Sequence, residues 1–191
     1  MNIVPLRYQA TEYDCGTTAF LNAISYVSSF SEIPPIFLKV LYNIGLNECN
    51  KAGMLGWEGT SLDAMRYLAA WINKYSQRTG FPLKCTCYDS VDFRKGSVLL
   101  DELQKKNTAI VTMCLLWDDH YITLTDVDDE YIYLFDPYYW DKDYGEEGIC
   151  RIDMPCKANR RLPIGFMETT KGKFYNLSVM KENIAIVFSW E

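Results

Sequence analysis

The sequence predicts an α+β fold in which a helical lobe packs against an antiparallel sheet. Apolar residues in the first half recur at helical spacing, as in residues 15–28, whereas dense apolar and alternating runs typical of strands begin at Thr108. The chain has 191 residues, of which 49% are hydrophobic, enough for one sizeable core. We therefore expect a single domain over residues 1–191, with a helical half at about 1–106 and a sheet half at about 107–191.

The first half contains one unusually apolar helix. Residues 1–13 are expected to form an irregular lead-in, after which a helix runs from about Cys15 to Ser28. No charged residue occurs between Asp14 and Glu32, so this helix should be enclosed on every side. The other elements expected in this half are helices from Pro35 to about Ile44, from Ser61 to about Arg78 and from Ser97 to Lys105, and a strand from Leu83 to Tyr88.

The second half changes to the period of a sheet. The run from Thr108 to Leu116 and the alternating segments 120–126 and 131–135 are typical of strands. Residues 137–173 are polar and aromatic, so we expect a loop that runs over the surface. The expected closing strands are Phe174 to Val179 and Ile184 to Trp190, the last in the sheet interior.

Composition excludes several function classes. The net charge of −6 argues against a nucleic-acid partner, and the densest basic spot, residues 157–161, is expected to be a solvated loop. No apolar run approaches the roughly 18 residues of a membrane span, and no signal peptide is visible, so we expect a cytoplasmic protein. Seven scattered cysteines and one histidine predict neither a disulfide framework nor a metal site, and no cofactor is expected.

Cys15 lies where a loop turns into the apolar helix. At a helix N-terminus the free N–H groups and the dipole favour a thiolate over a thiol. Asp14 could cap this helix, Gly16 would keep the approach to the sulfur open, and Gln9 could donate its side-chain amide to an oxyanion beside the sulfur. The alternative is an inert buried cysteine, since Cys is among the most buried residue types.

His120 is the single histidine, so a mechanism that needs an imidazole base must use it. It opens a predicted hairpin whose second strand ends at Asp136. The two side chains share a face only if the loop has an odd number of residues or the ladder contains a bulge. In that register Asp136 could orient the imidazole. The alternative is a half-exposed histidine and an ordinary Asp-Pro turn.

The order of Gln, Cys, His and carboxylate resembles that of the papain-like cysteine peptidases. The segments 13–19, 120–121 and 135–138 are similar to those of the bacteriocin-processing, double-glycine-type peptidases and their stand-alone relatives. The resemblance implies a papain-like fold, with the nucleophile helix buried against the sheet, and a peptide or protein substrate. It also implies four roles: Gln9 in the oxyanion hole, Cys15 as nucleophile, His120 as base and Asp136 as the orienting carboxylate.

Two departures from the family leave other functions open. Many members precede membrane spans and an ATPase, which this sequence lacks, and secreted papain relatives carry a Trp soon after the nucleophile where Phe20 stands here. A papain-like acyltransferase and a non-hydrolytic module that binds a leader or signal peptide are therefore alternatives. The Gly-rich stretch 53–59 with Trp57 could line a substrate groove, or it could be a plain helix-entry loop.

Overall fold

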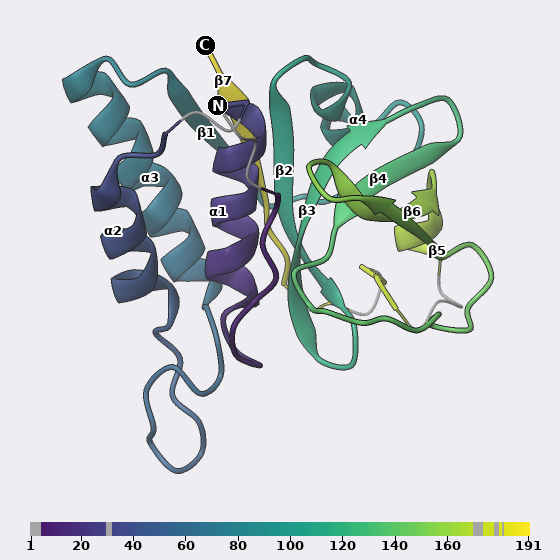
Figure 1. Cartoon of the computed structure of the whole chain (residues 1–191), viewed down its shortest axis with the longest axis horizontal. Helices are drawn as coiled ribbons and strands as arrows, with labels where there is room; N and C mark the ends of the chain where they lie inside the picture. The colour runs from purple at the N-terminus through teal and green to yellow at the C-terminus, as the bar shows by residue number, and fades with distance from the viewer. Residues whose placement is uncertain (1–4, 30–31, 170–173, 178–179, 181) are drawn as a thin grey trace.

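One antiparallel sheet of seven strands organises the computed structural model, which describes residues 5–29, 32–169, 174–177, 180 and 182–191 (Figure 1). The strand order is β1-β7-β2-β3-β4-β6-β5. The strands are β1 (Leu83–Tyr88), β2 (Thr108–Leu115), β3 (Asp119–Val127), β4 (Tyr131–Phe135), β5 (Cys150–Met154), β6 (Ala158–Pro163) and β7 (Ala185–Trp190). The helices are α1 (Cys15–Val27), α2 (Pro35–Gly45), α3 (Leu62–Thr79), α4 (Val98–Leu103) and a 3-10 turn η1 (Phe166–Glu168).

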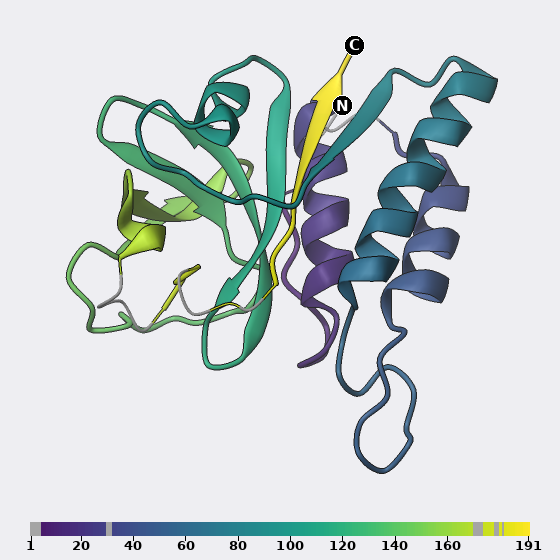
Figure 2. The ribbon, with the colours of Figure 1, turned by 180° about the vertical axis from the view of Figure 1, so that it is seen from behind.

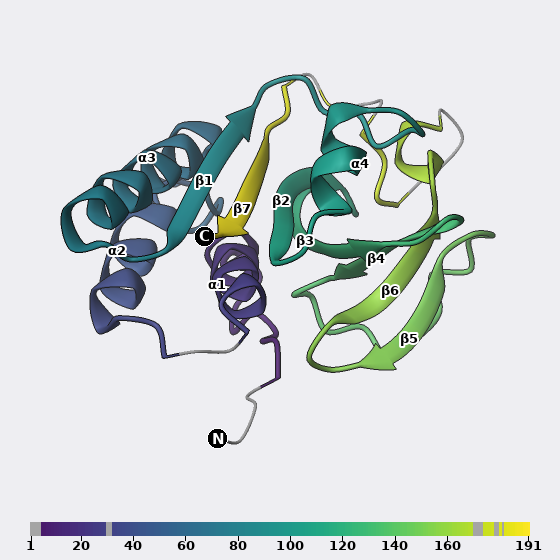
Figure 3. The ribbon, with the colours of Figure 1, turned by 90° about the horizontal axis from the view of Figure 1, so that it is seen from above.

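Helices cover both faces of the sheet, as Figure 3 shows from above. Alternate residues of β2 point to opposite faces: Val111 packs in a cluster with α1, α2 and α3, whereas Ile110 packs in a second cluster with α4. This is why β2 is an almost unbroken apolar run, since neither of its faces meets water. The expected α+β architecture is thus present in the described residues.

Helix α1 is buried along nearly its whole length, as its lack of charge predicts. Twelve of its thirteen residues are buried, including polar Thr17 and Asn22. The Thr123 hydroxyl of β3 donates a hydrogen bond to the Ala19 carbonyl of α1 at 2.9 Å. The helix therefore lies against β3 and β2 with its N-terminal tip at the end of the sheet where β3 begins (Figure 1).

The expectation of a loop over residues 137–173 is wrong in part. Strands β5 and β6 lie inside this range, and β6 pairs with β4 to extend the sheet. The basic segment 157–161 is likewise not a solvated loop, because most of it is β6 and Arg160 is buried. The Arg160 guanidinium donates to the backbone carbonyls of Asn159 and Trp140, which provide partners for its buried N–H groups.

The expected strand from Phe174 to Val179 is also wrong for its described residues. Only Asn176 pairs there, through an isolated bridge with Leu115, and residues 178–179 lie outside the described part of the chain. The last strand, β7, does lie in the sheet interior, between β1 and β2.

The loop between α2 and α3 projects beyond the ends of both helices, as the two opposite views show (Figures 1 and 2). A bridge between Cys49 and Leu55 narrows it into a hairpin-like shape. In the described residues, no helix is long and apolar enough to cross a membrane, and no group of three or more His, Cys, Asp or Glu side chains could hold a metal ion.

Candidate active site

Cys15 is the first residue of α1, and Asp14 occupies the N-cap position. The Asp14 carboxylate does not cap the helix; it accepts hydrogen bonds from the Ala10 and Thr11 N–H groups and from the Thr11 and Thr18 hydroxyls, at 2.6 to 3.2 Å. Burial acts to raise the pKa of Asp14, but these hydrogen bonds outweigh it and leave the pKa lowered. Asp14 therefore fixes the loop that leads to Cys15.

The lead-in segment before Cys15 is hydrogen-bonded to α1 on one side and to the chain after β4 on the other. The Asn22 side chain of α1 forms two hydrogen bonds with the backbone of Arg7, at 2.8 and 2.9 Å. Two residues later, the Gln9 N–H donates to the Pro137 carbonyl at 2.8 Å. The segment therefore links α1 to the chain directly after Asp136.

Gln9 itself is turned toward its own loop. Its side-chain amide donates to the Thr11 carbonyl at 2.7 Å, which leaves one amide N–H for another acceptor. Its side-chain oxygen is buried without a hydrogen-bond partner in the described residues. Among the described residues, no hydrogen bond joins the side chains of Gln9 and Cys15.

His120 and Asp136 lie together at the open end of the β3–β4 hairpin. The His120 Nε2 and the Asp136 Oδ1 are 2.8 Å apart, and both side chains are buried. A bulge between Leu124 and Asp126 shifts the register of β3 against β4, which is the condition needed for His120 and Asp136 to share a face. Ile122, next on that face of β3, packs in the same apolar cluster as Leu134 of β4.

The Asp136 carboxylate is held by four donors. Oδ1 accepts from His120 and from the Tyr138 N–H at 2.8 Å, and Oδ2 accepts from the hydroxyls of Tyr175 at 2.5 Å and Tyr144 at 3.2 Å. The Asn159 side chain also forms two hydrogen bonds of 2.8 Å with the Asp136 backbone. A fully buried carboxylate with this many donors keeps its charge and one orientation.

The electrostatics of this pair stabilise a protonated imidazole. Burial opposes a charge on His120, but the Asp136 carboxylate and a hydrogen bond with the Cys15 side chain raise the pKa of His120 to about 10. Burial likewise opposes the charge of Asp136, and His120 then lowers its pKa below the usual range. Because Nε2 faces Asp136, the other ring nitrogen, Nδ1, is the one available to the Cys15 sulfur.

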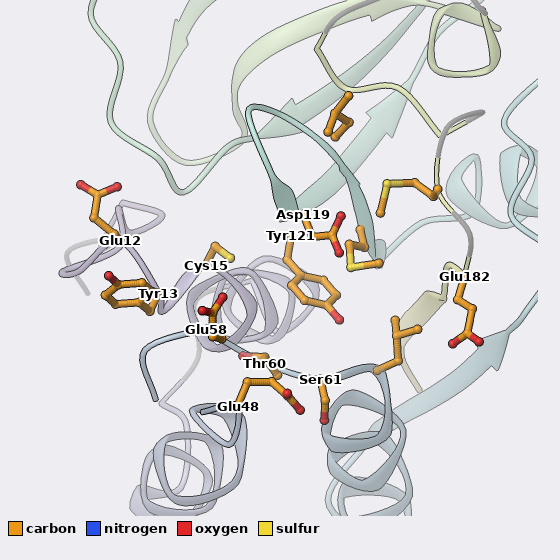
Figure 4. Close-up of a pocket in the computed structure, with 15 residues that line it drawn as sticks. Glu12, Tyr13, Cys15, Glu48, Glu58, Thr60, Ser61, Asp119, Tyr121 and Glu182 are labelled. Atoms are coloured by element: carbon orange, nitrogen blue, oxygen red, sulfur yellow. The ribbon is translucent and has the colours of Figure 1, made fainter. Parts of the chain in front are cut away.

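A cavity of about 600 Å³ opens beside Cys15. Its walls come from the lead-in segment, the tip of α1, the loop before α3, the ends of β2 and β3 and the segment before β7. Figure 4 shows Cys15 and Tyr121 among the side chains that line it. A Cβ on Gly16 would lie 2.5 Å from the Thr60 hydroxyl oxygen. Gly16 is thus needed for Thr60 to approach α1, rather than only to uncover the sulfur.

The Gly-rich loop contributes to this cavity in part. Glu58, Gly59 and Thr60 line it, but Trp57 does not. Trp57 is half exposed and instead packs against Tyr13, with 5.4 Å between the two ring centroids.

The structure thus brings Cys15, His120 and Asp136 together, whereas the Gln9 amide donates to the Thr11 carbonyl of its own loop. Sequence reasoning missed Tyr175, Tyr144 and Asn159, which hold Asp136. Tyr175 lies 39 residues beyond Asp136, and a tyrosine at that distance carries no local signal. Its backbone has a φ of 55°, a left-handed conformation that a bulky residue adopts only where its surroundings impose it.

No family model matches this chain, and no curated protein matches it significantly. Among solved structures, it is similar to a candidate C39-like peptidase from Bacillus anthracis. That likeness has a TM-score of 0.48 and 15% sequence identity, and it covers 96% of this chain and 94% of the other.

Proposed function

We propose that this protein is a papain-like cysteine peptidase that cleaves a peptide or protein substrate through Cys15, His120 and Asp136. The observation that carries the proposal is the buried series of contacts from the Cys15 side chain to His120 and on to Asp136, which begins at the wall of an open cavity. Nucleophile, base and orienting group in this order are the parts that nucleophilic acyl transfer requires.

In the proposed reaction the Cys15 thiol has already passed its proton to His120 before substrate binds, in line with the raised pKa of His120, and the Cys15 sulfur attacks the carbonyl carbon of the scissile peptide bond. The C–N bond then breaks, and His120 returns the proton to the leaving amine. Water next attacks the thioester, releases the carboxylate product and restores the thiol. Asp136 stabilises the imidazolium formed in each step, in line with the raised pKa of His120.

The oxyanion formed during attack needs donors beside the sulfur. We assign this role to the Cys15 N–H and to the amide N–H of Gln9 that Thr11 leaves free. A Gln9→Ala variant is expected to lose about 10²–10³-fold in kcat, the usual effect of removing one oxyanion donor.

We assign the bacteriocin-processing type as the finer class. The support for it is the sequence resemblance of the segments around Cys15, His120 and Asp136. No comparison with a family model adds to it.

The proposal is tested with a peptide library and intact-protein mass spectrometry. Wild type should cleave a subset of peptides and accumulate a thioester on Cys15 after a rapid quench, whereas Cys15→Ala and His120→Ala should do neither while keeping the native circular dichroism spectrum. Full activity in both variants would refute the assignment.

The same experiment separates the two alternatives. A thioester that is resolved by an added amine rather than by water identifies an acyltransferase. Equal peptide affinity of wild type and Cys15→Ala, with no acyl-enzyme in either, identifies a binding module.

A further inference from the structure

The cavity beside Cys15 is lined by carboxylates from separate parts of the chain. They come from the lead-in segment, the loop before α3, the start of β3 and the segment before β7, and they are Glu12, Glu48, Glu58, Asp119 and Glu182. The described lining residues include no Lys or Arg. None of the five carboxylates forms an ion pair with a described cation: the nearby Arg66 is paired with Asp63 and Asp89 instead.

Of the five carboxylate residues, Glu48 is half-buried and the other four are exposed. The N–H and carbonyl of Glu48 bond to the backbone of Gly59 and Gly56, so the loop holds it against the cavity. Burial, and then the charge of Asp118, raise the pKa of Asp119. Like charges gathered in one concave site repel one another, and a bound cation would relieve that repulsion.

Two buried hydroxyls in the same cavity lack partners. Tyr121 is 3% exposed and Thr60 is 8% exposed, and neither hydroxyl oxygen has a hydrogen-bond partner among the described residues. Figure 4 shows the Tyr121 ring reaching from β3 toward Thr60 and Ser61. Leaving a buried hydroxyl unpaired is unfavourable, so these two groups are suited to hydrogen bonds with a polar group of a ligand.

We propose that this cavity binds a cationic peptide segment, with a Lys or Arg side chain among its carboxylates and a backbone amide on the Tyr121 and Thr60 hydroxyls. That Cys15 then cleaves this segment rests on the proposed function. A carboxylate-lined site accepts ammonium and guanidinium groups, and the hydroxyls can both donate to a peptide carbonyl and accept from a peptide N–H. The substrates of this site are thus peptides with a basic residue near the scissile bond.

The test measures binding in the Cys15→Ala protein, so that cleavage does not interfere. The probes are two pools of acetylated, amidated octapeptides that are identical except at one position, which is Lys or Arg in one pool and Gln or Glu in the other. Immobilised protein should enrich the basic pool about tenfold, and raising the salt from about 0.05 M to 0.5 M should reduce this preference.

Matched variants test whether the preference for basic peptides arises from the carboxylates of the cavity. Glu48→Gln combined with Asp119→Asn should abolish most of the enrichment, whereas Glu130→Gln, which removes a carboxylate in the β3–β4 turn outside the cavity, should leave it unchanged. Equal capture of both pools, or a preference that survives the cavity variant, would overturn the inference. If the inference fails but wild type still cleaves neutral peptides, the proposed peptidase function remains supported. If basic peptides are captured but no acyl-enzyme forms, only the class of ligand is supported and the peptidase function is not.

Discussion

At the scale of single residues, the proposed chemistry depends on whether the His120 imidazole is protonated. His120 is the only histidine in the chain, so its ring resonances can be assigned without ambiguity. Its neighbour Asp136 is fully buried and is held by Tyr175, Tyr144 and the Tyr138 N–H. This environment makes the proton on His120 the property to measure.

Titration of the ring by NMR is the first prediction. Wild-type His120 should titrate with a pKa of about 10, because the Asp136 carboxylate and the Cys15 side chain stabilise the imidazolium. In Asp136→Asn the charge is lost while burial remains, so the pKa should fall to about 6.5 or below. Wild-type titration near 6.5 would contradict the described electrostatics.

The Tyr175 hydroxyl gives a second prediction. Tyr175→Phe removes the 2.5 Å hydrogen bond to Asp136 Oδ2 without removing the charge. We expect kcat to fall about tenfold with little change in KM, because Tyr175 positions Asp136 and does not touch the substrate. The pH profile of kcat should shift as well, which loss of packing alone would not produce; an unchanged profile would argue against the positioning role.

The sequence was informative about these residues only where a local pattern marks them. Cys15 stands at a helix start, and His120 and Asp136 stand at strand ends, so each could be singled out. Tyr175 and Asn159 contact Asp136 through the tertiary fold, at separations of 39 and 23 residues, and no periodicity marks such a contact.

At the scale of elements, the tip of α1 is positioned by its packing against the loop before α3. Gly16 meets the Thr60 side chain, and Gly45 at the end of α2 meets Thr17 of α1. A Cβ at Gly45 would lie 2.2 Å from the Thr17 Cγ2. Two glycines therefore allow α1, α2 and the cavity wall to approach one another.

The contact between Gly16 and Thr60 can be tested by a double-mutant cycle. Gly16→Ala should lower the free energy of unfolding by about 1–3 kcal/mol, the usual cost of overpacking. In a Thr60→Gly background the cost should be smaller, because the atoms that a new Cβ meets, Thr60 Oγ1 and Cβ, are gone. Urea titration of the four proteins measures the coupling, and strict additivity would show that the two residues do not touch.

The bulge in β3 illustrates what the sequence left open at this scale. The hairpin itself was predictable from the alternation in both strands. Which of its two registers forms depended on whether the loop has an odd number of residues or the ladder contains a bulge. The extra residue sits between Leu124 and Asp126, and Thr125 there has no sequence feature that distinguishes it from other strand threonines. The tertiary packing of Ile122 and Leu134 in one cluster is consistent with the bulged register.

At the scale of the whole molecule, the combination of helices with an antiparallel sheet was predictable, but the extent of the sheet was not. Strands β5 and β6 are short and rich in charged residues, and Pro155 lies between them, so they lack the usual strand pattern. β6 is stable as a strand because it pairs with β4 and because buried Arg160 bonds backbone carbonyls. Such compensation exists only in the folded chain.

The pH dependence of global stability follows from His120. Its pKa is about 6.5 in an unfolded chain and about 10 in the folded protein, so between these values the folded state binds the extra proton. The stabilisation is complete below about pH 6.5 and is lost as the pH rises toward 10, with a slope of at most about 1.4 kcal/mol per pH unit.

Urea titrations from about pH 6 to 9 check this sign. The comparison is made in a Cys15→Ala background, so that the coupled thiol is absent. The difference in unfolding free energy between Cys15→Ala and Cys15→Ala with His120→Gln should shrink as the pH rises, since the remaining groups that titrate in this range do so in both proteins. A constant difference would show that folding does not change the proton affinity of His120.

The central claim is that Cys15 and His120 form an activated pair, and alkylation of the thiols tests it most directly. Wild type and His120→Ala are treated with iodoacetamide across a range of pH, and mass spectrometry reports the rate at each of the seven cysteines. At about pH 6 an ordinary thiol is almost entirely protonated, so exposed Cys49 serves as the internal reference, whereas burial raises the pKa of Cys87 and makes it a less suitable one. We predict that Cys15 reacts fastest there although it is buried, and that this advantage disappears in His120→Ala. Reaction of Cys15 no faster than the reference in wild type would contradict the claim.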